Sequence, residues 1–166
     1  MHHHETRVVP YTADQMFDLV ADVARYPEFL PWVTAARIRT REPEAFVADV
    51  LVGFKSFREK FTSRVVLNRA KRVIIAEYLE GPFKHLTNKW HFEPHQGGGC
   101  AIDFDIDFEF KFRMLEKLIG SLFDRAVRQM TDAFETRAAQ LYGGAEQPVT
   151  APSAATSSAQ PQRSPS

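Results

Sequence analysis

Hydrophobic residues recur at steps of three and four between residues 113 and 142, which is the spacing of one face of an α-helix. Charged residues fall mostly on the other face, and Gly143-Gly144 provide a stop signal because glycine accepts the conformation that ends a helix. We therefore predict one continuous helix over 113–142, a rod of roughly 45 Å. Such a rod needs a broad apolar partner surface, which only the preceding segments can supply. Its apolar positions are Leu115, Leu118, Ile119, Leu122, Phe123, Ala126, Met130, Ala133, Phe134 and Leu141.

The start of the chain predicts a strand followed by short helical segments. Residues 5–10 have the character of a short strand that ends at a proline. Thr12 or Asp14 can cap the next helix, over residues 13–23, whose apolar residues form a stripe at helical spacing. A second short helix or turn follows near Ala24. These elements precede the segment in which the hydrophobic period changes.

From residue 34 to residue 112 apolar and polar side chains alternate, which predicts strands with one buried face and one face in water. The clearest strand covers residues 100–112, where Asp103, Asp105 and Asp107 share the solvent face. Short turns between successive strands predict an antiparallel meander. The order of strand, two short helices, six strands and a long helix predicts an α+β helix-grip fold. In this fold a curved antiparallel sheet of about seven strands surrounds the long C-terminal helix.

The end of the chain differs in composition from the rest. Residues 145–166 consist largely of proline, alanine, serine, glutamine and threonine, and they contain no aromatic residue. Such a segment buries too little apolar surface to offset the entropy lost on ordering. We predict a folded domain over residues 1–144 and a disordered tail over residues 145–166.

Composition and charge narrow the class of protein. The chain has 166 residues, with 21 lysines and arginines against 21 acidic residues, a balance that argues against a general nucleic-acid binder. Cys100 is the only cysteine, which fits a reducing cytoplasm and excludes an intrachain disulfide. We expect neither a signal peptide nor a membrane span, and a monomer or weak dimer that is cytoplasmic, with peripheral contact at the inner membrane left open. The run His2-His3-His4 is interpreted as native and frayed, without a metal site.

Patterns that would indicate catalysis are weak. The aspartates 103, 105 and 107 lack the glycine and the final glutamate of a calcium loop, and histidines 85, 91 and 95 lack a metal-binding spacing. There is no GxSxG, GxGxxG or P-loop sequence, so we expect a protein that is not an enzyme. Two outward rows of basic residues, Arg37/Arg39/Arg41 and Arg58/Lys60/Arg64, are either solvated or dock an anionic membrane or RNA.

Polar residues on the predicted inner face are the informative exceptions. Glu59 and Ser63 interrupt an apolar row on one strand, and Asn88 sits between Leu86 and Trp90 on another. Buried polar groups need partners, so these side chains either satisfy internal hydrogen bonds or form the polar end of a ligand pocket. Trp90 is either plain core or an indole donor to a ligand.

The connection YPEFLPW, residues 26–32, places two prolines and three aromatic residues in seven positions. The prolines exclude a continuous helix. The segment is either a well-packed corner or the entrance of a ligand or membrane site, because exposed apolar residues in a loop mark such places.

Several stretches resemble one protein family. They are VVPYTADQMFDLVADVARYPEFLPWV, VGFKSFREKFTSRV, GPFKHLTNKWHF and DFDIDFEF, followed by the long helix. Over residues 4–142 the chain resembles the coenzyme-Q-binding START-like family, part of the polyketide cyclase/dehydrase and lipid-transport superfamily with the birch-pollen-allergen fold. Bacterial members are also named ribosome association toxins. The resemblance implies an interior pocket that binds ubiquinone or a related polyprenyl lipid in support of respiration, and for the bacterial branch an effect on ribosomal subunit association.

We therefore expect a non-enzymatic lipid carrier whose bound ligand is ubiquinone and which has no other cofactor. The isoprenoid tail would lie between sheet and helix, and Lys55, Ser63, Asn88 and Trp90 are candidate donors to the quinone carbonyls. Glu59 donates only when protonated, or orients a donor. The first alternative is a ribosome-binding regulator that acts through the basic rows, and the second is a polyketide cyclase-type enzyme. The candidate ligand-binding residues are Phe29, Leu30, Trp32, Phe54, Lys55, Phe57, Glu59, Phe61, Ser63, Phe83, Asn88, Trp90, Phe104, Phe108, Leu115, Leu118, Leu122, Phe123 and Met130.

Overall fold

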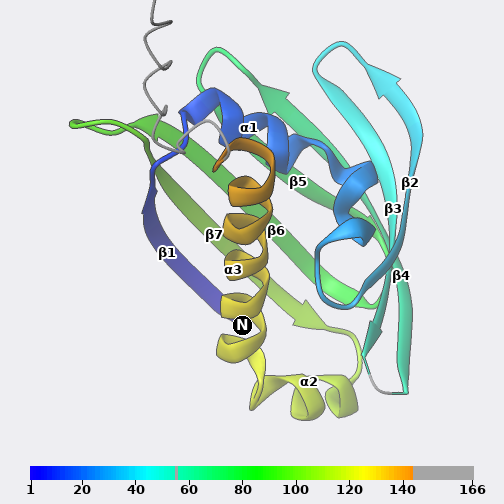
Figure 1. Cartoon of the computed structure of the whole chain (residues 1–166). Coiled ribbons are helices and arrows are strands. Elements are labelled where there is room, and N and C mark those ends of the chain that lie inside the picture. The colour runs from blue at the N-terminus through cyan, green and yellow to red at the C-terminus, as the bar shows by residue number, and fades with distance from the viewer. Residues whose placement is uncertain (55, 144–166) are drawn as a thin grey trace, which may run out of the picture.

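Seven antiparallel strands form one sheet in the computed structural model, which describes residues 1–54 and 56–143 (Figure 1). The strand order is β1-β7-β6-β5-β4-β3-β2, so neighbours in the chain are neighbours in the sheet except for β1. The elements are β1 (His2–Val9), α1 (Ala13–Ala21), the 3₁₀ helix η1 (Val23–Glu28), β2 (Val33–Glu42), β3 (Ala45–Phe54), β4 (Phe57–Asn68), β5 (Val73–Glu80), β6 (Phe83–Pro94), β7 (Cys100–Phe110), α2 (Arg113–Gly120) and α3 (Phe123–Tyr142).

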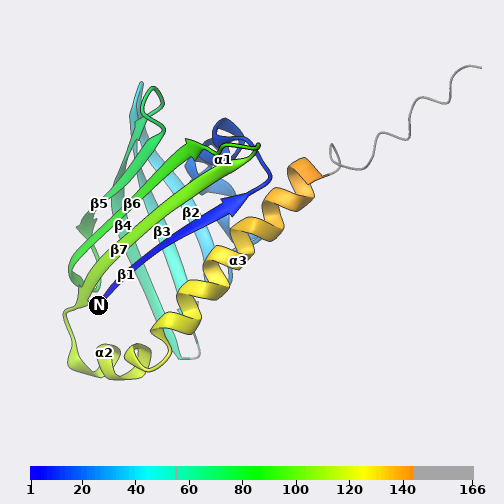
Figure 2. The ribbon, with the colours of Figure 1, turned by 90° about the vertical axis from the view of Figure 1, so that its left-hand side faces the viewer.

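The sheet curves around helix α3, which runs diagonally across its concave side (Figure 2). Strand β1 closes this arrangement by pairing with the distant strand β7, from His2 opposite Asp107 to Val9 opposite Cys100. The predicted helix-grip fold, with its antiparallel meander and seven strands, is thereby confirmed. The inner faces of strands and helix supply the apolar core, because side chains alternate between the two faces of each strand.

The N-terminal elements follow the predicted signals. Thr12 caps α1: its hydroxyl accepts from the backbone amide of Gln15, whose side chain accepts from the Thr12 amide. Helix α1 buries Met16 and Phe17 in the core, where the Phe17 ring meets the Phe92 ring of β6 edge-on. The next segment is the short helix η1, which accommodates Pro27 within 3₁₀ turns rather than in a continuous α-helix.

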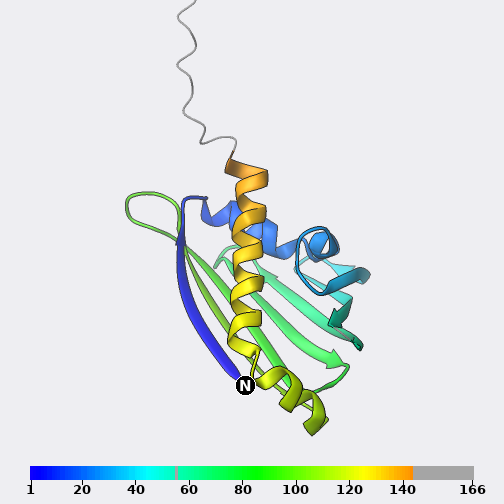
Figure 3. The same cartoon turned by 60° about the horizontal axis from the view of Figure 1, so that its bottom comes forward.

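The prediction of one continuous helix over 113–142 is wrong. The chain instead forms α2 and α3 as separate helices joined at Ser121 and Leu122, and the two point in different directions (Figure 3). Gly120 and Ser121 have weak helix propensity, so a change of direction costs little there. The change lets α3 cross the sheet, while α2 buries none of its residues.

The interpretation of His2–His4 as frayed is also wrong, since all three residues belong to β1. The Nε2 atoms of His2 and His4 lie 2.7 Å from carboxylate oxygens of Asp105 and Asp103 on the neighbouring strand. Asp103 and Asp105 of the outer row, predicted to be solvated, therefore have partners on β1.

Other expectations concern single residues and the ends of the chain. Cys100 is fully buried, and burial raises the pKa of its thiol to about 11, as is typical of an inert core cysteine. None of the helices in the described ranges combines the length and the apolar character needed to cross a bilayer. The predicted tail over residues 145–166 lies outside the described residues, and the domain boundary at residue 144 stays a prediction.

Candidate ligand-binding cavity between the sheet and helix α3

A cavity of about 330 Å³ separates the concave face of the sheet from α3. Its walls come from α1, η1 and the loop after it, β2 to β7 and α3, and they are almost wholly apolar. Ser63, Asn88 and Thr131 are the polar exceptions, together with the amphipathic rings of Tyr26, Trp32 and Trp90. Small-molecule sites usually have volumes of roughly 300–1,000 Å³ and a few polar groups in an apolar wall, and this cavity matches that description.

Small and β-branched residues on β3 leave room on one side of the cavity. Ala48, Val50 and Val52 face inward from this strand and line the space. The same inward register on β4 carries Phe61 and Ser63, which lie opposite Val50 and Ala48. The cavity exists because this wall is built from short side chains, whereas longer ones would reach α3.

Aromatic side chains form the other wall. The Trp90 ring lies 4.5 Å from the Phe104 ring and 5.2 Å from the Phe134 ring of α3, measured between centroids. Phe83 contacts Phe108 in the same way, with centroids 5.6 Å apart. Tilted and edge-to-face contacts of this kind pack the rings of this wall against one another.

Ser63 is the most informative polar residue of the cavity. It is 5% exposed, and its Oγ has no hydrogen-bond partner among the described residues. Asn88 lies on β6, and strand β5 runs between it and Ser63. Ser63 pairs with Tyr78 of β5 and Asn88 pairs with Ala76, two positions away on the same strand. Both polar groups therefore belong to the same sheet wall, and the Ser63 hydroxyl is free to bond to a ligand.

A second space, a groove of about 450 Å³, continues from the cavity toward α2. Cavity and groove share the lining residues Trp32, Val52 and Ala126. Trp32 has a φ of 66°, an uncommon value for a residue other than glycine, and its carbonyl accepts from the Gly53 amide at 2.8 Å. This backbone bond fixes the Trp32 ring between the two spaces, where it meets the Phe54 ring edge-on at 5.6 Å.

Most of the predicted ligand residues line one of these spaces. Phe54, Phe57 and Leu122 line the groove together with Trp32. The following predicted residues line the cavity: Leu30, Trp32, Phe61, Ser63, Phe83, Asn88, Trp90, Phe104, Phe108, Phe123 and Met130. The predicted entrance segment thus contributes Leu30 and Trp32 to the cavity wall.

Four predicted ligand residues lie elsewhere. Phe29 packs against Tyr26 and Phe134 and is not a wall residue. Glu59 has the inward register, opposite Val52, but lines neither space. Leu115 and Leu118 belong to α2, which turns away from the cavity because the helix is broken. Lys55 lies outside the described residues.

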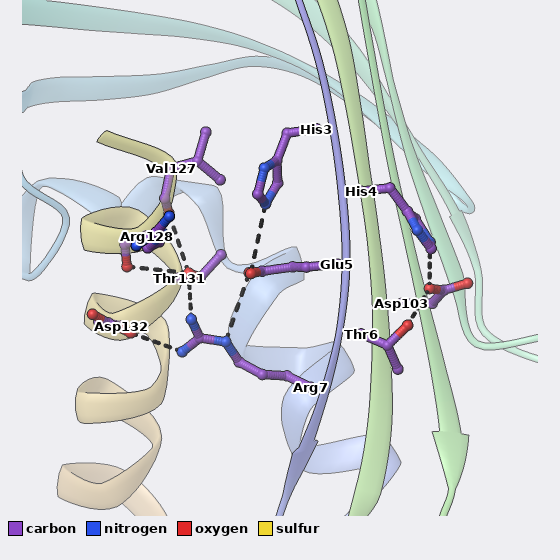
Figure 4. A network of polar contacts seen from close by, with 10 residues as sticks. All are labelled: His3, His4, Glu5, Thr6, Arg7, Asp103, Val127, Arg128, Thr131 and Asp132. Carbon is purple, nitrogen blue, oxygen red and sulfur yellow. Dashed lines mark hydrogen bonds and ion pairs between the residues drawn. The ribbon is translucent and has the colours of Figure 1, made fainter. Parts of the chain in front are cut away.

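A polar network that the sequence analysis missed joins β1 to α3 (Figure 4). Arg7 donates from Nη1 to Asp132 and from Nη2 to the Thr131 hydroxyl, both at 2.9 Å. Its Nε lies 3.6 Å from a carboxylate oxygen of Glu5, and the other oxygen lies 3.5 Å from the ring of His3. The available signal was the two-residue spacing of His3, Glu5 and Arg7, which places them on the inner face of one strand.

Comparison with known proteins agrees with this architecture. The chain is 37% identical over 139 residues to the "Ribosome association toxin RatA" of Rickettsia prowazekii, which covers 82% of this chain and 94% of that protein. It is 33% identical over 153 residues to the "Coenzyme Q-binding protein COQ10 homolog B, mitochondrial" of Xenopus laevis, covering 89% of this chain and 62% of that protein.

Two solved structures have the same fold. The Zhui aromatase/cyclase from Streptomyces sp. R1128 has a TM-score of 0.76 at 19% identity and covers 87% of this chain and 97% of its own. A START superfamily protein from Mycobacterium smegmatis has a TM-score of 0.69 at 21% identity and covers 84% and 98%. At these identities the likeness concerns the fold alone. Residues 9–135 match the family described as "Polyketide cyclase / dehydrase and lipid transport". The chain therefore belongs to the polyketide cyclase/dehydrase and lipid transport family and has its START-like, helix-grip fold.

Proposed function

We propose that the protein binds a polyprenyl quinone such as ubiquinone in the cavity between the sheet and α3, as a non-enzymatic carrier that supports respiratory electron transport. The observation that carries the proposal is an apolar cavity whose wall contains a buried hydroxyl, that of Ser63, without a described partner. A ligand with a long apolar part and one or two hydrogen-bond acceptors matches both features. The name of the COQ10 homolog supports the same ligand class.

The apolar walls supply most of the expected affinity. Each methylene group that leaves water is worth about 0.8 kcal/mol, so even a partly enclosed isoprenoid tail binds well. The groove extends the apolar surface beyond the cavity through Trp32, Val52 and Ala126. We expect part of the tail to lie in the cavity and the rest to follow the groove, with Trp32 and Phe83 at the openings.

Orientation of the ring would come from the few polar groups of the sheet wall. Quinone carbonyls accept hydrogen bonds, and the Ser63 hydroxyl and the Asn88 amide can donate them. The Trp90 indole is a third possible donor from the same wall. The described lining of the cavity contains no carboxylate, imidazole or thiol, so it offers no acid–base pair for a cyclase reaction.

Native mass spectrometry of the full chain purified from its own host tests this function. We expect one quinone per chain, and uptake of detergent-solubilised ubiquinone by protein stripped of lipid. Thermal unfolding gives a second readout, since a ligand at a hundred times its Kd stabilises by about 2.7 kcal/mol. Protein that carries no quinone and takes none up would refute the proposal.

Association with the large ribosomal subunit is the second candidate function, and the names of the RatA relatives favour it. On the edge strand β2, Arg37, Arg39 and Arg41 are all exposed, but Arg39 donates to Asp49 at 2.7 Å. Within this row, Arg37 and Arg41 are therefore the residues available to RNA. Overall neutrality of the chain is a point against this candidate.

Co-sedimentation with purified large subunits separates the two candidates. If the second is right, Arg37→Glu/Arg41→Glu weakens binding at least tenfold, while Arg128→Glu on α3 changes it little. Arg39 is left unchanged because its replacement by glutamate would set two carboxylates side by side. Absence of wild-type binding to the subunit would exclude this candidate.

A further inference from the structure

Helix α2 exposes apolar side chains that the cavity does not use. Phe112 is 62% exposed, Met114 82% and Leu118 40%, and the first two are the most exposed large hydrophobic residues of the described chain. Single exposed hydrophobic residues are normal on a protein surface. Here three of them fall within seven positions, Phe112 at the N-cap of α2 and Met114 and Leu118 on α2 itself, which has no buried residue.

The arrangement around α2 is strongly one-sided. At about 100° per residue, Met114, Leu118, Leu115 and Ile119 occupy one half of the helix, and Arg113, Glu116, Lys117 and Gly120 occupy the other. Leu115 and Ile119 pack against the body of the protein, so their edge of the apolar half is covered. The uncovered edge carries Met114 and Leu118.

Positive charge borders this uncovered edge. Going around the helix axis from Met114, away from Leu115, the next side chains are Lys117 and Arg113. Glu116 lies about 160° from Met114, on the far side of the helix. Within the described ranges no ion pair involves Arg113 or Lys117. Lys111, just before Phe112, is exposed and adds a third cation. An apolar strip beside unpaired cations is complementary to a bilayer with anionic headgroups.

The position of α2 connects this surface with the proposed path of a lipid. Ile119 of α2 and Leu122 just after it line the groove that continues from the cavity. Figures 1 and 2 show α2 at one end of the molecule, away from α1 and from the C-terminal end of α3. A bilayer that meets α2 would therefore lie next to the groove.

From these features we infer that Phe112 and α2 form a membrane-docking element for an anionic bilayer surface. Met114 and Leu118 enter the headgroup region, and Arg113 and Lys117 contact the lipid phosphates. A helix of eight residues buries little area, so the docking is reversible and depends on salt. Docking goes beyond the proposed ligand binding and does not require that a quinone be present.

Flotation with quinone-free vesicles tests the docking. Full-length protein should bind vesicles of phosphatidylcholine and phosphatidylglycerol at 3:1, and bind at least tenfold more weakly to phosphatidylcholine alone or in 0.5 M salt. Met114→Asp should weaken binding at least fivefold. The matched control is Leu141→Asp, at a residue that is 50% exposed near the other end of α3, and it should change binding less than twofold.

A second pair of variants tests the contribution of Arg113 and Lys117 to vesicle binding. Arg113→Gln/Lys117→Gln should lower binding to the anionic vesicles at least threefold, and Arg128→Gln on α3 should leave it unchanged. Circular dichroism and thermal unfolding establish that each variant is folded. Wild-type protein that binds neither vesicle, or Met114→Asp protein that binds as the wild type does, would overturn the inference.

Two further outcomes assign this surface differently. A wild-type dimer in sedimentation velocity that Met114→Asp converts to monomer would identify a second copy of the chain as the occupant. Ribosomal binding that is lost on Met114→Asp, without any vesicle binding, would identify the ribosome. Because the vesicles contain no quinone, the flotation assay and the quinone-binding assay are independent. A negative result in flotation would refute membrane docking but not quinone binding, and a negative result in native mass spectrometry would refute quinone binding but not docking.

Discussion

At the scale of single residues, two neighbouring hydroxyl groups on β4 have opposite surroundings. Thr62 donates to the carboxylate of Asp49, which also accepts from Arg39, and the Thr62 and Arg39 bonds keep the pKa of Asp49 below its ordinary value. Ser63 faces the cavity without a described partner. The Thr62 hydroxyl stabilises the fold through its hydrogen bond. The Ser63 hydroxyl lowers stability because it is buried without a described partner, and we assign it to ligand binding.

This contrast predicts different effects for two small substitutions. Ser63→Ala should leave the free energy of unfolding unchanged or raise it by about 1 kcal/mol, and lower quinone affinity about fivefold, because a buried unpaired hydroxyl is removed. Thr62→Val should lower the free energy of unfolding by about 1–3 kcal/mol and leave quinone affinity unchanged. Urea unfolding and ligand titration measure the two quantities.

The pH dependence of the stability lost in Thr62→Val provides a control for this prediction. Because the pKa of Asp49 is lowered in the folded state, the stabilisation that involves Thr62 is present above the ordinary carboxyl pKa and is lost as the pH falls through the lowered value. The cost of Thr62→Val should therefore shrink toward pH 2. A Ser63→Ala protein that is destabilised by more than about 1 kcal/mol would contradict our assignment of its hydroxyl.

At the scale of elements, the contact between β1 and α3 closes the sheet onto the helix. Half-buried Arg7 of β1 reaches Thr131 and Asp132 of α3, and half-buried Glu5 of the same strand lies 3.6 Å from the Arg7 guanidinium (Figure 4). Pairs of this kind are strongly coupled, because removing one charge leaves the other in a poorly solvated place.

A double-mutant cycle tests this coupling. Arg7→Met should lower the free energy of unfolding by about 2–3 kcal/mol, because it leaves Glu5 half-buried without its cation. The double variant Glu5→Leu/Arg7→Met should return to within about 1 kcal/mol of the wild type. Asp132→Asn, at an exposed position, should cost less than about 1 kcal/mol. A double variant at least as unstable as Arg7→Met would contradict the assigned coupling.

At the scale of the whole molecule, the cavity exists because the curved sheet and α3 do not fill the space between them. Ala126 of α3 stands where the cavity and the groove meet. Its small side chain keeps the two spaces connected. A larger side chain at this position would occupy volume that the proposed ligand needs.

Filling that space provides the test at this scale. Ala126→Leu should leave the free energy of unfolding unchanged or raise it by about 1 kcal/mol, since added methyl groups enter an empty apolar volume. It should lower quinone binding at least tenfold in native mass spectrometry. Ala139→Leu, on the exposed side of the same helix, should change neither quantity. Destabilisation of Ala126→Leu by more than about 1 kcal/mol would mean that the volume is not free.

Local patterns in the sequence determined much of this fold. Strand positions follow from alternation, the Thr12 cap from its residue type, and the inward row on β4 from the two-residue period that places Ser63 beside Phe61. The family resemblance, carried by several motifs, led to the same helix-grip fold. These features depend on neighbours along the chain, so they can be read without coordinates.

Only the tertiary structure decided which of these residues meet. Helical spacing alone could not show that the chain turns at Ser121 and Leu122, and therefore that Leu115 and Leu118 do not line the cavity. The partner of Arg7 lies more than a hundred residues away on α3, and the Ser63 hydroxyl has no partner among the described residues because the folded wall places no acceptor or donor beside it. Burial and pairing are set by contacts between distant segments, and a periodic pattern carries no information about that distance.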